Sequence, residues 1–227
     1  MVGGDFLDKE KLFSEAFPFW SGLSDSDRDM LLRTSQSVRF GRGENIHDGG
    51  ECTGVILVGR GSLRVYMLSD EGKEITLYRL FPGDVCILSA SCVLTSITFD
   101  VFIDAEEDSE CTVIGGCAIE ELANRVKDVK IFVLETALGR FSDVMWAMQQ
   151  ILFMSMDKRL AIFLSDEAAK CGGNIHLTHE QIAKYMGTAR EVVSRMLKYF
   201  VSEGLVSVSR AEGIRILDKA RLRALTR

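Results

Sequence analysis

Two arginines and a glutamate near the end of the sequence have a spacing that lets them act together. Arg190, Glu191 and Arg195 stand at offsets of one and four residues, which places them on one face of a helix. Arginine can donate two hydrogen bonds to O6 and N7 of guanine, and glutamate can accept one from N4 of cytosine. The alternative is an ordinary solvated helix face on which Glu191 and Arg195 form an i,i+4 ion pair.

The residues around this trio predict two helices joined at a glycine. Thr178 stands three residues before Gln181, the spacing of a capping box that opens a helix. That helix stops at Gly187, which can adopt the left-handed conformation needed between two helices, and the next helix closes at Gly204. Two alternating strands around residues 211–213 follow. Together these elements predict a winged helix-turn-helix whose second helix presents its N-terminal end to the major groove.

Other side chains of the same segment fit the two sides of such a helix. Lys198, Arg210 and Arg215 are basic and can neutralise the flanking phosphates of double-stranded DNA. Val193 and Met196 fall on the opposite face of the second helix, where we expect them to pack into the core.

Charge is divided unevenly along the chain, whose net charge is −6. Residues 156–227 contain 13 Lys and Arg against 8 Asp and Glu, a net charge of +5, whereas residues 1–155 contain 14 against 25, a net charge of −11. This asymmetry indicates two domains with different partners, the basic one meeting a polyanion. A surface whose charges are merely solvated is the alternative.

The acidic part begins with a region of short β-strands, at about residues 40–114. Its apolar segments are rich in β-branched and aromatic residues, which favour strands. These segments are 54–58, 62–67 and 75–80. Turn residues separate them, for example at 70–72 and 82–84, which predicts an antiparallel sandwich or jelly roll. Ahead of the strands, Ser24 stands at the N-cap position of an amphipathic helix.

A helix with an apolar stripe links the two parts. The stripe repeats in steps of three and four residues, a heptad pattern by which two helices bury a shared seam. Its members are Ile131, Leu134, Leu138, Phe141, Met145, Met148 and Leu152. Val133, Ala137 and Val144 widen the apolar surface, so we expect one side to cover the barrel and the other to form a homodimer. A helix buried within a single protomer is the alternative.

Nearly the whole sequence resembles the Crp/Fnr family of bacterial transcription regulators. The text that carries the resemblance is GRGENI at residues 41–46, VGRGSLRVYMLSDEGKEITLYRLFPGD at 58–84 and LTHEQIAKYMGTAREVVSRMLKYFVSEGLVSV at 177–208. The resemblance implies an α+β fold with an N-terminal double-stranded β-helix (a cyclic-nucleotide-binding-like jelly roll), a long dimerisation helix and a C-terminal winged helix-turn-helix. It also implies a homodimer on an inverted-repeat operator, with RNA polymerase as a further partner.

The resemblance assigns roles to individual residues as well. The positions matching Arg190, Glu191 and Arg195 contact bases, and those matching Thr178 and Ser194 lie near the DNA, as His179 does beside them. The domains expected from it are a sensor β-barrel with N-terminal helices (1–118), a dimerisation helix (119–154) and the DNA-binding domain (155–227). Because the sequence has no run of about 18 uncharged apolar residues and no signal peptide, we expect a cytoplasmic protein.

At the effector site the sequence departs from the cyclic-nucleotide binders of this family. After the positions matching Gly83 and Asp84, those proteins carry a glutamate for the ribose and an arginine for the phosphate. Here no basic residue lies between Arg79 and Arg125, so a cyclic phosphate lacks a cation and cyclic AMP is not expected. The iron–sulfur branch needs a cysteine cluster near the N-terminus, and the first cysteine here is Cys52. No such cluster is expected, and the effector is left open.

A weakly polar set of residues remains as the candidate effector pocket. It consists of Gly83, Asp84, Cys86, Ser89, Ser91 and Cys92. In one interpretation these thiols or His47 sense oxidation, a metal or haem. In the other the thiols only pack, and the pocket takes a small apolar ligand. The six cysteines form no C-x-x-C pair, so no zinc site is expected.

An enzyme is the alternative from a different class, because jelly rolls also host metal-dependent oxygenases and isomerases. Such a site needs several His or Glu ligands. The chain has three histidines, His47, His176 and His179, and the last two lie in the helix-turn-helix segment. One histidine in the barrel predicts that the protein is not an enzyme.

Overall fold

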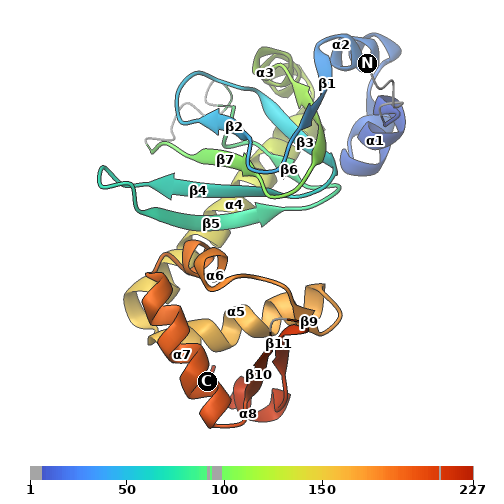
Figure 1. Ribbon diagram of the computed structural model, residues 1–227. Coiled ribbons are helices and arrows are strands. Elements are labelled where there is room, and N and C mark those ends of the chain that lie inside the picture. Colours follow the sequence, from blue (N-terminus) through green and yellow to red (C-terminus); the bar gives the residue numbers. More distant parts are fainter. Residues whose placement is uncertain (1–6, 91–92, 94–98, 210, 227) are drawn as a thin grey trace. The chain divides into compact units, whose positions relative to one another are not determined.

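The structure is a computed structural model that describes residues 7–90, 93, 99–209 and 211–226 (Figure 1). The chain divides into two compact units. The first contains Met1–Leu68 and Leu77–Val144, and the second contains Met145–Arg227 together with the short segment Ser69–Thr76. Within these described ranges, none of the helices combines the length and the apolar character needed to cross a membrane.

Two four-stranded antiparallel sheets form the body of the first unit (Figure 1). In the order of their pairing, the strands of one sheet are β1 (Ser35–Phe40), β8 (Ser109–Ile114), β3 (Val55–Arg60) and β6 (Val85–Cys86), and those of the other are β2 (Asn45–Asp48), β7 (Phe102–Ala105), β4 (Leu63–Leu68) and β5 (Glu74–Leu80). Ile56, Val58, Leu63, Val65 and Ile103 are fully buried in one apolar cluster between them. The predicted jelly roll is confirmed.

Short helices precede the strands of this unit. They are α1 (Lys9–Ala16), the 3-10 helix η1 (Trp20–Gly22) and α2 (Asp25–Arg33). Ser24 caps α2 as predicted, because its hydroxyl accepts a hydrogen bond of 3.2 Å from the amide of Asp27. Phe17 and Phe19 from this region each meet the ring of Phe132, with centroids 5.5 and 5.3 Å away. Aromatic packing therefore fixes this region against the later helix that carries Phe132.

The helix expected over residues 119–154 is two helices, and this expectation needs correction. α3 covers Gly116–Arg125 and α4 covers Lys127–Phe153. Val126 between them has an extended backbone, with φ −114° and ψ 109°. The apolar spacing runs through this position without a proline or glycine, so periodicity alone could not locate the break. On α4, Val129 and Val133 are buried in the core of the first unit.

The second unit is a helical domain with a small sheet. Its elements are α5 (Met156–Lys170), β9 (Asn174–Ile175), α6 (His179–Met186), α7 (Arg190–Ser202), β10 (Val206–Ser209), β11 (Gly213–Ile216) and α8 (Lys219–Ala224). β10 and β11 form the predicted hairpin, and β9 adds a third strand against β11. The winged helix-turn-helix is thus confirmed, with β9 and α8 as additions.

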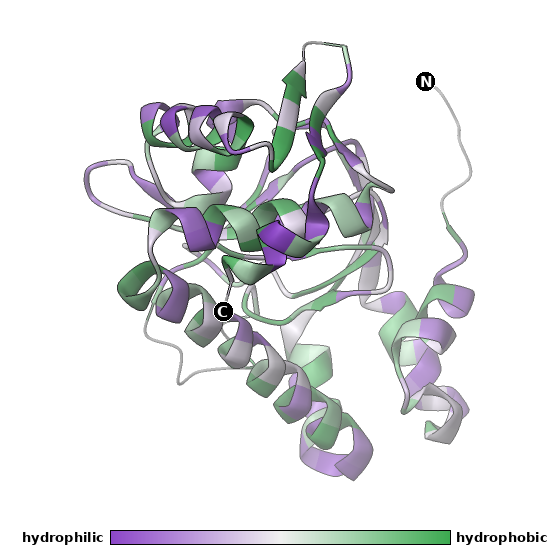
Figure 2. Cartoon of the chain, turned by 90° about the horizontal axis from the view of Figure 1, so that it is seen from below, coloured by the Kyte–Doolittle hydropathy of each residue, from purple (hydrophilic) through white to green (hydrophobic). Residues whose placement is uncertain are grey.

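A separate apolar core holds this domain together. Leu160, Leu164, Ile182, Leu197 and Phe200, from α5, α6 and α7, are fully or almost fully buried in it. Hydrophobic and hydrophilic residues alternate along the helices in Figure 2, as expected of helices that bury one face. The domain therefore has the internal packing needed to present its outer faces to a partner.

Gly54 provides a test of the barrel's packing. Its φ is +100°, and a Cβ there would overlap the carbonyl oxygen of Ile114, whereas Gly43 has φ +83° with open space around it. Both Gly→Ala changes cost roughly 1–2 kcal/mol for the left-handed backbone. We expect Gly54→Ala to lose roughly 1–3 kcal/mol more. Urea unfolding at one fixed protein concentration measures the difference, and equal losses would contradict the close approach of β3 and β8.

Candidate nucleic-acid interface

The first helix of the helix-turn-helix begins with a complete capping box. The hydroxyl of Thr178 accepts a hydrogen bond from the amide of Gln181 (3.1 Å), and the side chain of Gln181 accepts one from the amide of Thr178 (2.8 Å). Ile182, Ala183 and Met186 then face the core. The predicted start of α6 is confirmed. The Thr178 hydroxyl also donates a hydrogen bond to the side chain of Gln181, so both of its hydrogen bonds in the structure belong to the capping box.

The turn after α6 has the predicted left-handed glycine. Gly187 has φ 59° and ψ 44°, and its amide donates to the carbonyls of Ala183 and Lys184. The amide of Thr188 also donates to Ala183, at 3.0 Å. These bonds satisfy carbonyls that the end of α6 would otherwise leave unpaired. The chain then enters α7 at Arg190 in a fixed direction.

α7 has one buried and one exposed face. Val193, Leu197 and Phe200 are between 0 and 1% exposed. The exposed face carries the predicted base-reading residues, which border a shallow hollow of about 430 Å³. Its lining is Arg190, Glu191, Ser194, Arg195 and Lys198. The structure therefore brings together the five candidates that the sequence placed on this helix.

The ion pair that the alternative interpretation required is not formed. Within the described part of the chain, Glu191 and Arg195 make no salt bridge, and Arg190 and Lys198 have no carboxylate partner either. These three cations and the carboxylate of Glu191 are exposed. Side chains in this state can meet base edges and phosphates without first breaking an internal bond.

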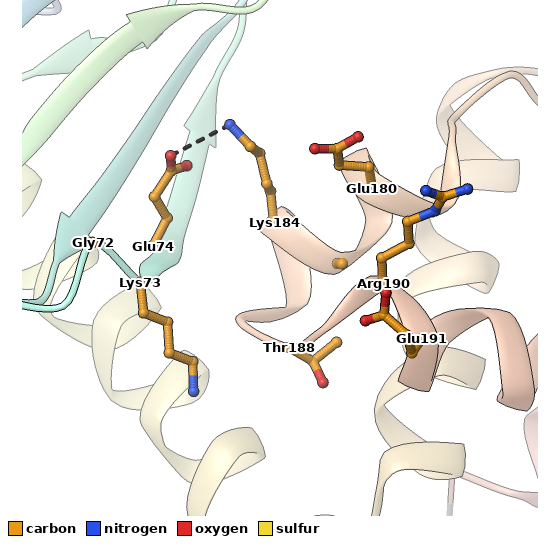
Figure 3. A pocket seen from close by; sticks show the side chains of 9 residues that line it. Gly72, Lys73, Glu74, Glu180, Lys184, Thr188, Arg190 and Glu191 are labelled. Atoms are coloured by element: carbon orange, nitrogen blue, oxygen red, sulfur yellow. Dashed lines mark hydrogen bonds and ion pairs between the residues drawn. The ribbon is translucent and has the colours of Figure 1, made fainter.

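The remaining candidates are more scattered. His179 is partly exposed in the first turn of α6, and Arg215 is exposed on β11 opposite Ser207. Arg210 lies outside the described residues. Two residues that the sequence interpretation did not select, Lys184 and Thr188, line a second hollow beside Arg190 (Figure 3). Lys184 could have been selected from the sequence only as a basic residue on the predicted first helix, where it is exposed.

The second hollow has a volume of about 400 Å³, and all the residues that line it belong to the second unit. Gly72, Lys73 and Glu74, from the segment Ser69–Thr76, form part of its lining. Glu74 from that segment pairs with Lys184, its Oε1 3.3 Å from Nζ (Figure 3). The hydroxyl of Thr76 donates to the carbonyl of Lys184 at 3.2 Å. Lys184 is thus already engaged, unlike the cations of α7.

The four candidate effector residues that the structure describes lie in two different environments. Gly83 and Asp84 line a hollow of about 400 Å³ together with residues of α4. Cys86 and Ser89 are completely buried, and the Ser89 hydroxyl donates to the carbonyl of Gly54 at 2.7 Å. Ser91 and Cys92 lie outside the described residues. Gly83 and Asp84 therefore lie at the surface hollow, whereas Cys86 and Ser89 lie in the interior.

A basic side chain does reach this hollow, and the sequence interpretation missed it because it comes from α4. Arg140 lies 3.6 Å from Asp84 and 3.1 Å from Asp143, and its guanidinium stands over the ring of Tyr78 at 4.9 Å. Two carboxylates therefore face one guanidinium. In the described part of this hollow, Arg140 is therefore already paired and is not a free cation.

The sulfur and imidazole candidates are both shielded. Burial raises the pKa of the Cys86 thiol above its ordinary value. Burial also lowers the pKa of His47, against the opposing effect of Asp48 and Asp100, and its Nδ1 lies 2.8 Å from the Thr53 hydroxyl. Across the described residues, no three His, Cys, Asp or Glu side chains are grouped to hold a metal ion.

Thiol alkylation tests the shielding of Cys86. The thiolate is the reactive form, and each unit of raised pKa lowers its population about tenfold. We expect iodoacetamide at pH 8 to modify Cys86 at least about tenfold more slowly than the exposed Cys117 and Cys171. Peptide mass spectrometry over time measures the rates, and unfolding in urea serves as the control that equalises them. Equal rates in the folded protein would return Cys86 to the candidates for a redox sensor.

Known proteins match both the helix-turn-helix and the whole chain. Residues 158–225 match the Crp-like helix-turn-helix domain. A crystal structure assigned to a transcriptional regulator of the Crp/Fnr family from Eubacterium rectale is 44% identical, with a TM-score of 0.86, and the match covers 93% of this chain and 98% of that one.

More distant relatives agree with this match. The transcriptional activator protein Anr from Pseudomonas aeruginosa is 27% identical over 217 residues, which cover 89% of this chain and 86% of that protein. FixK2 from Bradyrhizobium japonicum has the same fold, with a TM-score of 0.71 at 21% identity over 85% of this chain and 98% of that one. The relatives from Eubacterium rectale and Pseudomonas aeruginosa are named as transcription regulators, and these matches do not support the enzyme alternative. The chain belongs to the Crp/Fnr family of DNA-binding transcription regulators.

Proposed function

We propose that this regulator acts as a homodimer on an inverted-repeat operator and reads it with Arg190, Glu191 and Arg195. Residues 1–118 are the sensor, the helix that ends near residue 154 joins the protomers, and residues 155–227 bind the DNA. The observation that carries this proposal is the exposed face of α7, whose three cations have no carboxylate partner among the residues that the structure describes. Such a face, in a domain of net charge +5, suits a partner that combines phosphates with guanine-bearing base pairs.

The division of labour within this face follows from chemistry. Arg195 can hold guanine O6 and N7 with two parallel hydrogen bonds, which specifies one base pair. Lys198, one turn further along α7, is a point charge that neutralises a phosphate of any sequence. Thr178, His179, Ser194, Arg210 and Arg215 complete the proposed contacts near the backbone.

The dimer proposal rests on the apolar stripe of α4. Leu134, Leu138 and Phe141 are 56, 67 and 62% exposed in a single protomer, and Met145 and Met148 are 46 and 45% exposed. Exposed apolar side chains in one continuous row mark a surface that a partner covers. Because the row follows a heptad, the partner with matching spacing is the same helix of a second copy.

The proposal has two further partners, an effector and RNA polymerase. The effector is a small molecule or a redox signal and not cyclic AMP, because Arg140 beside Gly83 and Asp84 is already paired with two carboxylates. The relative from Pseudomonas aeruginosa is called a transcriptional activator, and activation requires contact with RNA polymerase. A regulator of bacterial promoters meets its DNA in the cytoplasm.

Charge placed in the stripe tests the dimer. In the double variant Phe141→Asp and Met145→Asp, four carboxylates would be buried together, so we expect dissociation. Sedimentation velocity should show a monomer at concentrations where the wild type is a dimer. The control is Phe141→Leu with Met145→Leu, which keeps the apolar stripe and should stay dimeric. A dimeric Asp variant would show that the seam lies elsewhere.

Base reading is tested by selection from randomised DNA duplexes at one fixed salt concentration. The wild type should select two half-sites about one helical turn apart, centre to centre. Arg195→Ala should lose roughly 1–3 kcal/mol per half-site and relax the preference at one base pair.

Lys198→Ala is the matched control on the same helix. It should weaken all sequences alike and flatten the salt dependence of binding. If Arg195→Ala selects the same sequence as the wild type with the same stringency, Arg195 reads no base and the proposed placement of α7 in the groove is wrong.

A further inference from the structure

Arg159, in the first turn of α5, reaches the far end of α6. α5 starts at Met156 after Ser155, and the Arg159 side chain donates a hydrogen bond to the backbone carbonyl of Met186. Met186 is the last residue of α6. One side chain therefore ties the beginning of one helix to the end of another within the second unit.

A second contact fastens the same end of α6. Phe163 stands one helical turn after Arg159 on α5, and its ring stacks on Tyr185, with centroids 5.7 Å apart and planes inclined by 27°. Tyr185 and Met186 are consecutive, so one face of α5 holds the final turn of α6 by a stacked ring and by a hydrogen bond. The left-handed Gly187 and the path into α7 begin at this point.

The environment of Arg159 indicates that this side chain positions the backbone and does not form an ion pair. The side chain is partly buried, and burial lowers the pKa of Arg159. Among the described residues no carboxylate forms an ion pair with it. The negative end of the α6 dipole and the Met186 carbonyl are what stabilise the guanidinium. An apolar side chain would pack here without desolvating a charge, but it could not hold a carbonyl in place.

We propose that Arg159 is a positioning residue for DNA reading. By fixing the carbonyl of Met186 it holds the turn after α6, and thereby the direction in which α7 presents Arg190 and Arg195. Reading geometry is lost when such side chains are displaced by more than a fraction of an ångström or some ten degrees. The inference rests on the proposed function of α7, and Arg159 itself contacts neither base nor phosphate.

Binding measurements on the full-length protein test this role. Arg159→Met keeps the length of the side chain and removes both the donor and the charge, and Arg159→Lys keeps a charged donor. The probes are the duplex selected by the wild type and an unrelated duplex of equal length, at one salt concentration. We expect Arg159→Met to bind the selected duplex about tenfold more weakly, which corresponds to about 1.4 kcal/mol, with less than about a twofold change on the unrelated duplex. Arg159→Lys should recover most of this loss.

Arg221 provides a matched control. It donates to the carbonyl of Glu203 at 3.0 Å, after the other end of α7, so it makes the same kind of bond away from the base-reading residues. Arg221→Met should leave the ratio of the two affinities unchanged. If it lowers that ratio as much as Arg159→Met does, general loosening of the domain explains the result and the proposal fails.

Other outcomes are equally decisive. A folded Arg159→Met protein with the wild-type ratio overturns the proposal, and so does an equal loss on both duplexes with a flatter salt dependence, which would make Arg159 a phosphate contact. If Arg159→Met does not fold by circular dichroism, Arg159→Ala, which also lacks the donor, carries the test, and a wild-type ratio in Arg159→Ala overturns the proposal. Arg195→Ala in the same assay separates the two hypotheses. If that variant keeps its selectivity, the proposed function has failed, and if it alone loses selectivity, only the role of Arg159 has failed.

Discussion

At Gly187 the backbone passes through a left-handed conformation, and the orientation of everything that α7 presents depends on this one turn. A residue with a Cβ would disfavour the conformation by roughly 1–2 kcal/mol. The capping box at Thr178 fixes the other end of α6, so this helix has a defined length of eight residues. The fully buried Val193 then sets the rotation of α7 about its axis. Turn, cap and core contact together leave one outward face for DNA.

Basic residues in both units form salt bridges, Lys184 and Arg221 of the second unit among them, but within the described ranges those on the exposed face of α7 do not. In the first unit, arginines from the strands and helices are paired with acids. The pairs are Arg39–Glu110, Arg64–Asp104, Arg79–Glu106, Arg125–Asp27 and Arg140–Asp84. On α7, Arg190, Arg195 and Lys198 have no such partner in the described structure. Among the described residues, no acid neutralises the charges of these three cations, so positive charge is concentrated on the exposed face of α7.

Features set by local sequence were the ones that the sequence predicted well. The cap at Thr178, the glycine at Gly187 and the alternating strands depend on residues a few positions apart, so their signals are visible in one dimension. The break at Val126 carries no turn residue and was missed. The contacts of Arg140 with Asp84 and Val85, and of Arg159 with Met186, were missed for another reason, since these partners lie 27 or more residues away along the chain. Only the folded chain brings such partners together.

The exposed row on α4 has a consequence for how the gene product responds to its own abundance. Leu138 and Phe141 are more than three-fifths exposed in a lone protomer, so in the proposed homodimer they would be covered only when two copies meet. While monomers predominate, the number of paired molecules rises with the square of the amount synthesised, and a doubling of synthesis gives a roughly fourfold rise in the DNA-reading species.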